Sequence, residues 1–514
     1  MNKQPIARAL CLSSMAGLTL TTLAQQAAKP NILFILCDDM GYGDLGCYGQ
    51  PYIATPNLDR MAAEGMRFTQ AYAGSPVSAP SRATLMTGQH TGHTHVRGNK
   101  EYWTDRSVQY GVCTEYRVTG QEPYTTDHRI LPEIMKDNGY TTGMFGKWAG
   151  GYEGSRSTPD KRGIDEYYGY VCQYMAHKYY PNFLNRYSTR RGDSLTIRIE
   201  LTENTCHPDG ATSDDYRKRT QYSADLIHRE ALEWLDQQSA DRPFYGLFTY
   251  TLPHAELYQP NDSILQTYEG RFCNDKDFAG RGRYHATKHV HAQFAAMITR
   301  LDAYVGEIMA KLAEKGLAEN TLLIFSSDNG PHEEGGADPT FFGRDGKLKG
   351  LKRSCHEGGI RVPFIVRWPG KVKAGSVNDQ PIVFYDIMPT FCDLIGVDNY
   401  VQRYRNAGLG EQDYFDGLSF APTLLGHDER QQHHDFLYWE FHETDQIAVR
   451  QGDWKLLVKK GRCELYDLSA DLHEDHDVAA QYPEKVRQLK QIIKEQHTPS
   501  PIAQFNQLTL PPFD

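Results

Sequence analysis

Residues 78–88 carry residue types that could present a nucleophile to an anion. They read Ser-Ala-Pro-Ser-Arg-Ala-Thr-Leu-Met-Thr-Gly, so small residues, a proline and Arg82 precede an apolar run. Such a segment can hold a hydroxyl at a loop-to-helix junction beside a cation, because proline fixes one backbone angle and a helix N-terminus favours negative charge. On these residues alone, a helix N-cap formed by Ser81 is the more ordinary interpretation.

Oxygen-bearing side chains follow two apolar runs, residues 31–37 and 321–327. Continuous apolar runs of this length predict strands buried on both faces of a parallel sheet, and ligands bind at the carboxyl ends of such strands. The residues that come directly after the runs are Asp38, Asp39, Asp328 and Asn329. Four oxygen ligands suit Ca²⁺, or less well Mg²⁺, and the absence of a neighbouring His or Cys disfavours zinc.

Residues 78–88 resemble the C/S-x-P-S-R-x-x-x-L-T-G signature of type I sulfatases, with Met86 where leucine is usual. The resemblance extends over nearly the whole chain beyond its first residues. It implies that a maturase oxidises Ser78 to formylglycine (3-oxoalanine). It also implies that Asp38, Asp39, Asp328 and Asn329 bind calcium, with an oxygen of the modified Ser78 completing the coordination shell.

A second resemblance concerns Lys147, in the segment Gly146-Lys147-Trp148. Many sulfatases continue this segment with His-Leu-Gly, and the resemblance implies that Lys147 contacts both sulfate and formylglycine. This chain has Ala149 and Gly150 at the next two positions, so the role of the family's histidine cannot be assigned to position 149. His177 is a candidate for that place, and a structural histidine is the alternative.

Two further residues are matched to catalytic roles by the resemblance. His254 follows the strand-like residues 244–250 and a proline, and would protonate the leaving alcohol. Lys352 lies in a Lys-x-x-x-x-Glu-Gly-Gly pattern and would grip the sulfate. In this scheme one hydroxyl of the aldehyde hydrate attacks sulfur and the other expels sulfate, while Arg82, Lys147 and Lys352 neutralise the anion.

Other polar residues are candidate contacts to a sugar, which makes a sulfated carbohydrate the expected substrate. They are Arg97, Asn99, His177, His332, Glu440, His442 and Arg450. The aromatic residues Tyr179, Tyr180 and Trp439 are compatible with stacking against sugar rings. Similarity to a glycan-sulfatase subgroup suggests an exo-acting enzyme on sulfates of galactose or N-acetylgalactosamine.

The composition of the 514 residues excludes several other classes of protein. Hydrophobic residues make up 39% and charged residues 23%, which is typical of a globular protein that can bury a large core. The formal net charge of −10 disfavours nucleic-acid binding, which depends on clustered Lys and Arg. Ten cysteines without CxxC pairs disfavour a zinc ribbon.

Residues 1–24 predict a secretory signal peptide, because two basic residues precede a short apolar stretch and small residues. The protein is therefore expected to be exported to the periplasm or secreted. No later run reaches the roughly 18 apolar residues that span a bilayer, so we expect no membrane span.

The elements that must position these side chains alternate between strand and helix. This order predicts an α/β fold with a large, mostly parallel, doubly wound sheet flanked by helices. We expect the catalytic domain to occupy residues 25–395 and a smaller α+β subdomain to occupy residues 396–514. In the subdomain, residues 436–443 alternate like an exposed antiparallel strand, and residues 484–496 predict a terminal helix.

Two alternative functions remain open at this point. One is a phosphodiesterase or phosphonate hydrolase of the related alkaline-phosphatase superfamily, which two transition metals with several His ligands would favour. The other is a catalytically inactive glycan-binding protein, for which an unmodified Ser78 and the missing histidine at position 149 would be the grounds.

Overall fold

The computed structural model describes residues 29–110, 114–204, 219–343, 346–397 and 415–513. The predicted signal peptide lies outside these residues, as does much of the expected start of the C-terminal subdomain. No helix in the described ranges is long and apolar enough to cross a membrane.

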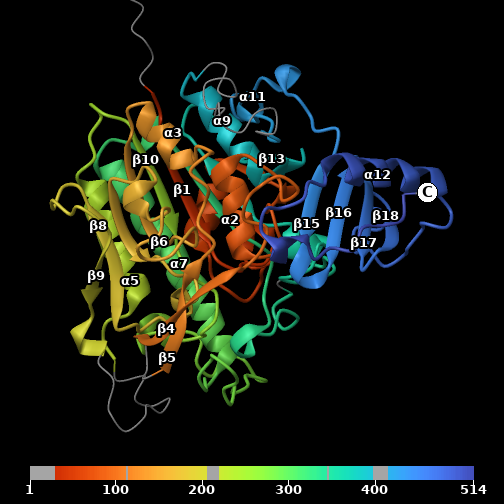
Figure 1. Cartoon of the computed structure of the whole chain (residues 1–514). Coiled ribbons are helices and arrows are strands. Elements are labelled where there is room, and N and C mark those ends of the chain that lie inside the picture. Colours follow the sequence, from red (N-terminus) through yellow and green to blue (C-terminus); the bar gives the residue numbers. More distant parts are fainter. Residues whose placement is uncertain (1–28, 111–113, 205–218, 344–345, 398–414, 514) are drawn as a thin grey trace, which may run out of the picture.

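A ten-stranded mixed sheet forms the centre of the molecule (Figure 1). Its strands, in spatial order, are β13 (Ser376–Asn378), β2 (Met66–Phe68), β12 (Phe364–Arg367), β11 (Thr321–Ser327), β1 (Asn31–Cys37), β10 (Phe244–Thr249), β6 (Thr141–Lys147), β7 (Glu166–Tyr170), β8 (Phe183–Ser188) and β9 (Ile197–Glu200). The five strands from β11 to β7 are parallel, whereas β12, β8 and β9 run antiparallel to their neighbours. The predicted parallel sheet is therefore confirmed at its centre, and antiparallel strands extend both sides.

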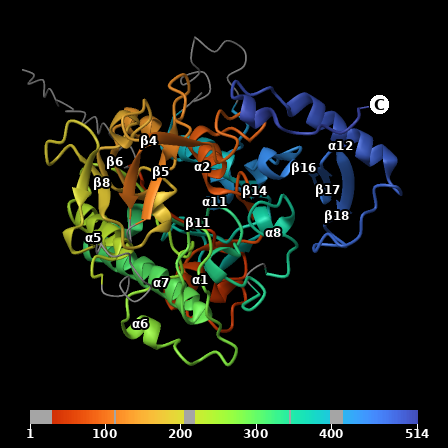
Figure 2. The same ribbon diagram turned by 60° about the horizontal axis from the view of Figure 1, so that its bottom comes forward.

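Helices cover both faces of this sheet, as the doubly wound prediction requires (Figures 1 and 2). One face packs against α1 (Pro56–Ala63), α5 (Ser223–Asp236) and α7 (Val290–Glu314), and the other against α2 (Ser78–Thr87), α3 (Leu131–Asp137) and α9 (Ile387–Leu394). Successive residues of β1 alternate between the two cores: Ile35 and Cys37 join the first, Phe34 and Leu36 the second. This two-sided burial explains why β1 is apolar throughout.

The remaining elements are short or lie at the edges of the sheet. β3 (Ala71–Tyr72) and β14 (Ile382–Val383) form a parallel pair, and β4 (Glu101–Tyr110) and β5 (Thr114–Gln121) form an antiparallel hairpin. The short helices are α6 (Ser263–Gln266), α8 (Glu357–Ile360) and α11 (Ala421–Leu424).

The C-terminal part contains an antiparallel sheet of four strands beside the main domain (Figure 1). These are β15 (Leu437–Phe441), β16 (Gln446–Gln451), β17 (Trp454–Lys459) and β18 (Arg462–Asp467), and α12 (Pro483–Gln496) packs on them. The predicted terminal helix is confirmed. The prediction that residues 436–443 form an exposed strand is wrong, because all of β15 is buried: Trp439 faces the main domain and Tyr438 faces the α12 side.

A buried ion pair network joins this small sheet to the main domain. The Nζ of Lys455 on β17 lies 2.9 Å from Glu357 Oε1 and 3.0 Å from Glu474 Oε1, and all three side chains are fully buried. The hydroxyl of Tyr72 donates to Glu357 Oε2 at 2.7 Å. Because burying charges is costly unless they are paired, this network ties β17 firmly to α8.

Candidate functional site

Asp38, Asp39, Asp328 and Asn329 meet at the carboxyl ends of two adjacent parallel strands. The register pairs Cys37 at the end of β1 with Ser327 at the end of β11, so the residues that follow must lie together. The Asp39 amide donates to Asp328 Oδ1 at 3.2 Å, and Asn329 Nδ2 donates to Asp39 Oδ1 at 2.7 Å. All four side chains are fully buried, and their predicted convergence is confirmed.

Ser78 is the first residue of α2, so Ser81 lies inside the helix and is not its N-cap. Its Oγ lies 2.8 Å from Asp38 Oδ1 and 2.5 Å from Asp328 Oδ2. Lys147 Nζ, at the end of β6, donates to Ser78 Oγ at 2.9 Å. The helix therefore delivers this hydroxyl directly into the group of carboxylates, with its positive end toward them.

Three cations surround these acids. Arg82, one turn after Ser78 on α2, places Nε and one terminal nitrogen each 2.9 Å from Asp328 Oδ2. Lys147 Nζ lies 2.6 Å from Asp38 Oδ2. Lys352 Nζ lies 2.8 Å from Asp39 Oδ2. The three predicted cations thus reach the site from three separate elements.

The cations set how the carboxyl groups titrate. Burial alone would raise the pKa of Asp38, but the charges of Lys147, His254 and Arg82 hold this pKa well below its ordinary value. The pKa of Asp328 is raised to about 6, because burial and the negative charge of Asp38 outweigh Arg82 and Lys147. Neighbouring acids with such different surroundings are typical of functional sites.

His254 lies beside the acids, in the segment after β10. Its Nε2 is 2.9 Å from Lys352 Nζ and 3.2 Å from Asp39 Oδ2, and its Nδ1 is 2.5 Å from the Ala255 carbonyl oxygen. Burial and the charge of Lys352 lower the pKa of His254, while Asp39 acts in the opposite direction. The sequence argument against zinc rested on the absence of a histidine here, and the fold brings one to the site.

A cavity of about 340 Å³ opens over Ser78. Its wall contains Lys147, His254 and Lys352 together with two of the predicted sugar contacts, Asn99 and His177. The ring of His177 stacks on that of His254, with centroids 4.1 Å apart and planes 12° apart, and its buried Nδ1 has no hydrogen-bond partner among the residues that the structure describes. Ala149, the position of the family's histidine, is fully buried and does not line the cavity.

The other predicted sugar contacts lie outside the cavity wall. Arg97 is buried and donates to the carbonyl and hydroxyl oxygens of Thr498. Glu440 accepts hydrogen bonds from Tyr438 and His497, and Arg450 donates to Gln70 and Gly452. These three fasten the C-terminal sheet and the last residues to the main domain, a role that polar residue types alone cannot reveal.

Two predicted histidine contacts are also packed behind the wall. His332 is buried, accepts from the Glu334 amide at 3.0 Å and stacks on His254 at 5.4 Å. The ring of His442 lies against Phe505. The proposed stacking residues Tyr179, Tyr180 and Trp439 are at most 4% exposed, so they stabilise the core instead of facing a sugar.

Several wall residues were missed by the sequence reasoning. They are Glu101, Gln173, Tyr174, Arg283, Glu334, Arg353, Glu443 and Gln504. Glu334 accepts from Arg353 at 2.7 Å and lies 3.4 Å from Lys352 Nζ. Glu334 closely follows β11 and Arg353 is next to Lys352 in sequence, so both could have been predicted from their proximity to known site residues. Arg283 has no such neighbour in sequence.

A buried acid behind the wall clamps three segments that each contribute a wall residue. Glu256 Oε1 accepts from Lys178 Nζ at 2.5 Å and lies 2.6 Å from His285 Nδ1. Lys178 also donates to the Arg283 carbonyl, and the Glu256 amide donates to the His177 carbonyl. Although burial would raise the pKa of Glu256, Lys178 and His285 lower it to about 2, so this acid stays ionised.

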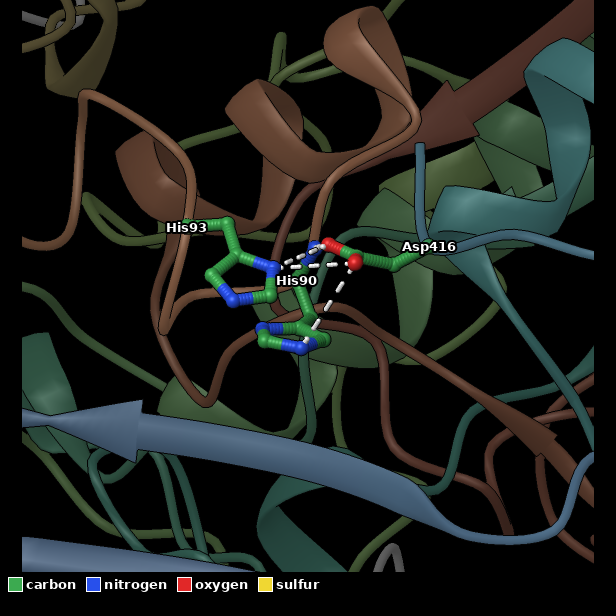
Figure 3. Close-up of side chains that lie close together, drawn as sticks. All are labelled: His90, His93 and Asp416. Atoms are coloured by element: carbon green, nitrogen blue, oxygen red, sulfur yellow. Dashed lines mark hydrogen bonds and ion pairs between the residues drawn. The ribbon is translucent and has the colours of Figure 1, made fainter. Parts of the chain in front are cut away.

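A second group of potential ligands, His90, His93 and Asp416, lies away from the cavity (Figure 3). His93 Nδ1 lies 2.9 Å from Asp416 Oδ1, and the two histidine rings stack at 4.1 Å. The Gly92 amide donates to His90 Nδ1, so a neutral His90 carries its proton on Nε2, the atom that faces Asp416 and Gln496. A protonated nitrogen cannot bind a metal, so we interpret this group as a structural link between two loops.

The fold and this arrangement of buried acids, cations and a histidine around a hydroxyl define a hydrolase that acts on an anionic ester. The family comparison is specific: residues 30–397 match the sulfatase family model, and residues 351–499 match the model "N-sulphoglucosamine sulphohydrolase, C-terminal". The chain belongs to the sulfatase family. It is a sulfuric ester hydrolase.

Similar proteins include enzymes of known name and solved structures. An N-acetylgalactosamine-6-O-sulfatase of Bacteroides thetaiotaomicron is 28% identical over 92% of this chain and 94% of its own length. Ps i-CgsB, in its crystal structure in complex with k-i-k-neocarrahexaose, is 26% identical in sequence to this chain. The two structures superpose with a TM-score of 0.67, and the match covers 94% of this chain and 95% of that chain. A phosphonate monoester hydrolase of Agrobacterium radiobacter, 22% identical with a TM-score of 0.60 over 91% and 96%, shares the fold.

The clamp behind the wall predicts a large effect of Glu256→Gln. The change removes the carboxylate that pairs with the buried ammonium of Lys178 and should lower the free energy of unfolding by about 3–5 kcal/mol. Chemical denaturation measures this loss. The matched control is Glu153→Gln, which breaks the solvent-accessible pair with Arg198 and should cost less than about 1 kcal/mol. A similarly small loss for Glu256→Gln would contradict the proposed clamp.

The His90 link predicts a pH-dependent stability. Burial lowers the pKa of His90 to about 4, against 6.5 in the unfolded chain, so protonation between these values favours unfolding. The free energy of unfolding should fall by about 3 kcal/mol between pH 7 and pH 4 through this group. In thermal unfolding at several pH values, the melting temperature of His90→Gln should depend less on pH than that of the wild type. The control is His427→Gln at an exposed position; equal profiles for His90→Gln and wild type would refute the link.

Proposed function

We propose that this chain hydrolyses sulfate esters of carbohydrates with a formylglycine made from Ser78 and a bound Ca²⁺. The observation that carries the proposal is the position of Ser78 Oγ, within 3 Å of two buried carboxylates and the Lys147 ammonium. An unmodified serine hydroxyl would form a sulfated enzyme that is hard to clear. When present, formylglycine supplies a nucleophilic hydroxyl that can afterwards be freed of sulfate.

The acidic residues fit a calcium ion. Asp38, Asp39 and Asp328 offer carboxylate oxygens, and Asn329 Oδ1 is a buried oxygen without a hydrogen-bond partner in the described part of the chain. Oxygen donors in this number suit Ca²⁺ better than Mg²⁺, which prefers to keep several waters. Calcium, when bound, supplies positive charge that favours an ionised nucleophile and an anionic substrate.

The other site residues divide the remaining tasks. Arg82, Lys147 and Lys352 neutralise the sulfate, and their burial strengthens that attraction. His254 lines the same cavity and delivers a proton to the departing alcohol oxygen. Because Nδ1 lies against the Ala255 carbonyl, the imidazole ring is held with Nε2 toward Lys352 and Asp39.

We further propose a glycan substrate carrying galactose or N-acetylgalactosamine sulfate, attacked at a chain end. Support comes from the names of the similar enzymes and from a small cavity whose wall mixes acids, arginines and the predicted contacts His177 and Asn99. Sugar hydroxyls both donate and accept hydrogen bonds, so such a mixed wall suits them. On the basis of the expected signal peptide, we propose that a maturase oxidises Ser78 and that the enzyme acts in the periplasm or outside the cell.

The two alternatives make different demands on this site. A phosphonate hydrolase shares the fold, so the fold alone does not separate the two activities. A two-metal phosphodiesterase needs several histidine ligands, and one histidine, His254, lies with Asp38 and Asp39 here. A glycan-binding protein without activity has no use for an oxidised Ser78, whereas cations around it serve binding as well as catalysis.

The first test concerns Ser78. When the protein is co-expressed with a maturase, intact-protein mass spectrometry should give a mass about 2 Da lower than the mass calculated for the unmodified sequence. Ser78→Ala should not show this loss. Ser78→Ala should reduce sulfate release by at least about a thousandfold while keeping the wild-type melting temperature. Substantial residual activity in Ser78→Ala would refute the assignment.

The second test concerns the metal. Elemental analysis of purified protein should find calcium in a one-to-one ratio with the chain, and Asn329→Ala together with Asp39→Ala should abolish it. Dialysis against a chelator should remove activity and lower the melting temperature, and Ca²⁺ should restore both better than Mg²⁺. Stoichiometric zinc in active protein would instead favour the phosphodiesterase alternative.

A further inference from the structure

Trp103 is the most exposed large hydrophobic side chain among the described residues, at 66% exposure. It belongs to β4, the first strand of the β4–β5 hairpin, drawn in orange in Figure 2. Tryptophan in most proteins is largely buried, because its indole removes more apolar area from water than most side chains. Exposed in this way, the indole offers a large apolar face to a ligand.

The base of the hairpin forms part of the cavity wall. Glu101, the first residue of β4, lines the cavity, and Trp103 is two residues further along the same strand. Two residues of a strand span about 7 Å, so Trp103 lies about that far from Glu101 along β4, where the pairing with β5 is irregular on both sides of Trp103. Tyr102, between them, is held by other contacts: its hydroxyl donates to Glu122 Oε2 and its ring packs against Tyr152.

The partner strand attaches this position to the wall. Trp103 pairs with Val118 of β5, whose side chain is buried in the main core. The Cys172 thiol lies 4.0 Å from the Val118 carbonyl oxygen, and the next two residues, Gln173 and Tyr174, line the cavity. The indole is therefore carried on a fixed strand at the rim of the cavity, with its ring open to solvent.

We propose that Trp103 is a stacking platform for the sugar joined to the sulfated one. This inference rests on the proposed glycan substrate. The cavity of about 340 Å³ is at the small end for ligand sites and suits a single sugar, so the next unit of a chain must pass over the rim. The C–H face of a pyranose ring packs on an indole face, and its hydroxyls stay in water.

The test compares sulfated sugars with and without that neighbour. Galactose and N-acetylgalactosamine sulfates are presented as free monosaccharides and as the terminal residue of disaccharides. Trp103→Ala should lower kcat/KM for the disaccharides about tenfold, which corresponds to 1.4 kcal/mol, and leave the monosaccharides unchanged. Trp103→Phe should keep most of the wild-type kcat/KM for the disaccharides. Tyr52→Ala, at another exposed aromatic outside the cavity wall, should change neither.

Equal losses on both kinds of substrate, or no loss on either, would overturn the platform. If wild-type enzyme releases sulfate from no member of the panel, the proposed substrate class fails. In that case the platform is tested by calorimetry. The affinities of carrageenan and chondroitin sulfate oligosaccharides are measured for Ser78→Ala and for the double variant Ser78→Ala, Trp103→Ala. Equal affinities, or no binding to either, would overturn it. Sedimentation analysis gives a further contrary outcome. If the wild-type protein is a dimer and Trp103→Ala is a monomer, the indole packs against a second copy of the chain and the platform is overturned.

Discussion

The structure depends on the compensation of buried negative charge at the ends of β1 and β11. Three aspartates lie there without exposure to water, and an isolated buried carboxylate costs several kcal/mol. Arg82, Lys147 and Lys352 provide positive charge within 3 Å of these acids. Each cation comes from a different element, so the site can form only when α2, β6 and the segment before α8 have all reached the central sheet.

The centre of this site was predictable from the sequence. Apolar runs identified β1 and β11 and the polar residues after them, the resemblance to sulfatases implied that these residues share one site, and the observed parallel pairing lays Asp38 beside Asp328. Ser78, Lys147, His254 and Lys352 came from resemblance to sulfatases, and the geometry brings all four to one cavity. Their chemical roles belong to the proposed function, whereas their proximity is a property of the fold.

The cavity wall was harder to predict, for a physical reason. Arg97, Glu440 and Arg450 have the residue types expected of sugar contacts, but they pair with Thr498, His497 and Gln70, which lie far away in sequence. Polar residue type indicates that a partner exists and does not say which one. Aromatic residues gave the same difficulty, since Tyr179 and Trp439 are core residues and Trp103 is exposed.

The residues that handle charge and those that form the outer wall belong to different parts of the architecture. The former lie at the ends of strands of the central sheet, on α2 or just before α8, whereas Glu101 and Trp103 lie on a hairpin outside that sheet. A hairpin can lengthen, shorten or change its side chains without shifting the register of β1 against β11. Diversification of such an enzyme toward new glycans can therefore proceed at its periphery while the reaction centre is inherited intact.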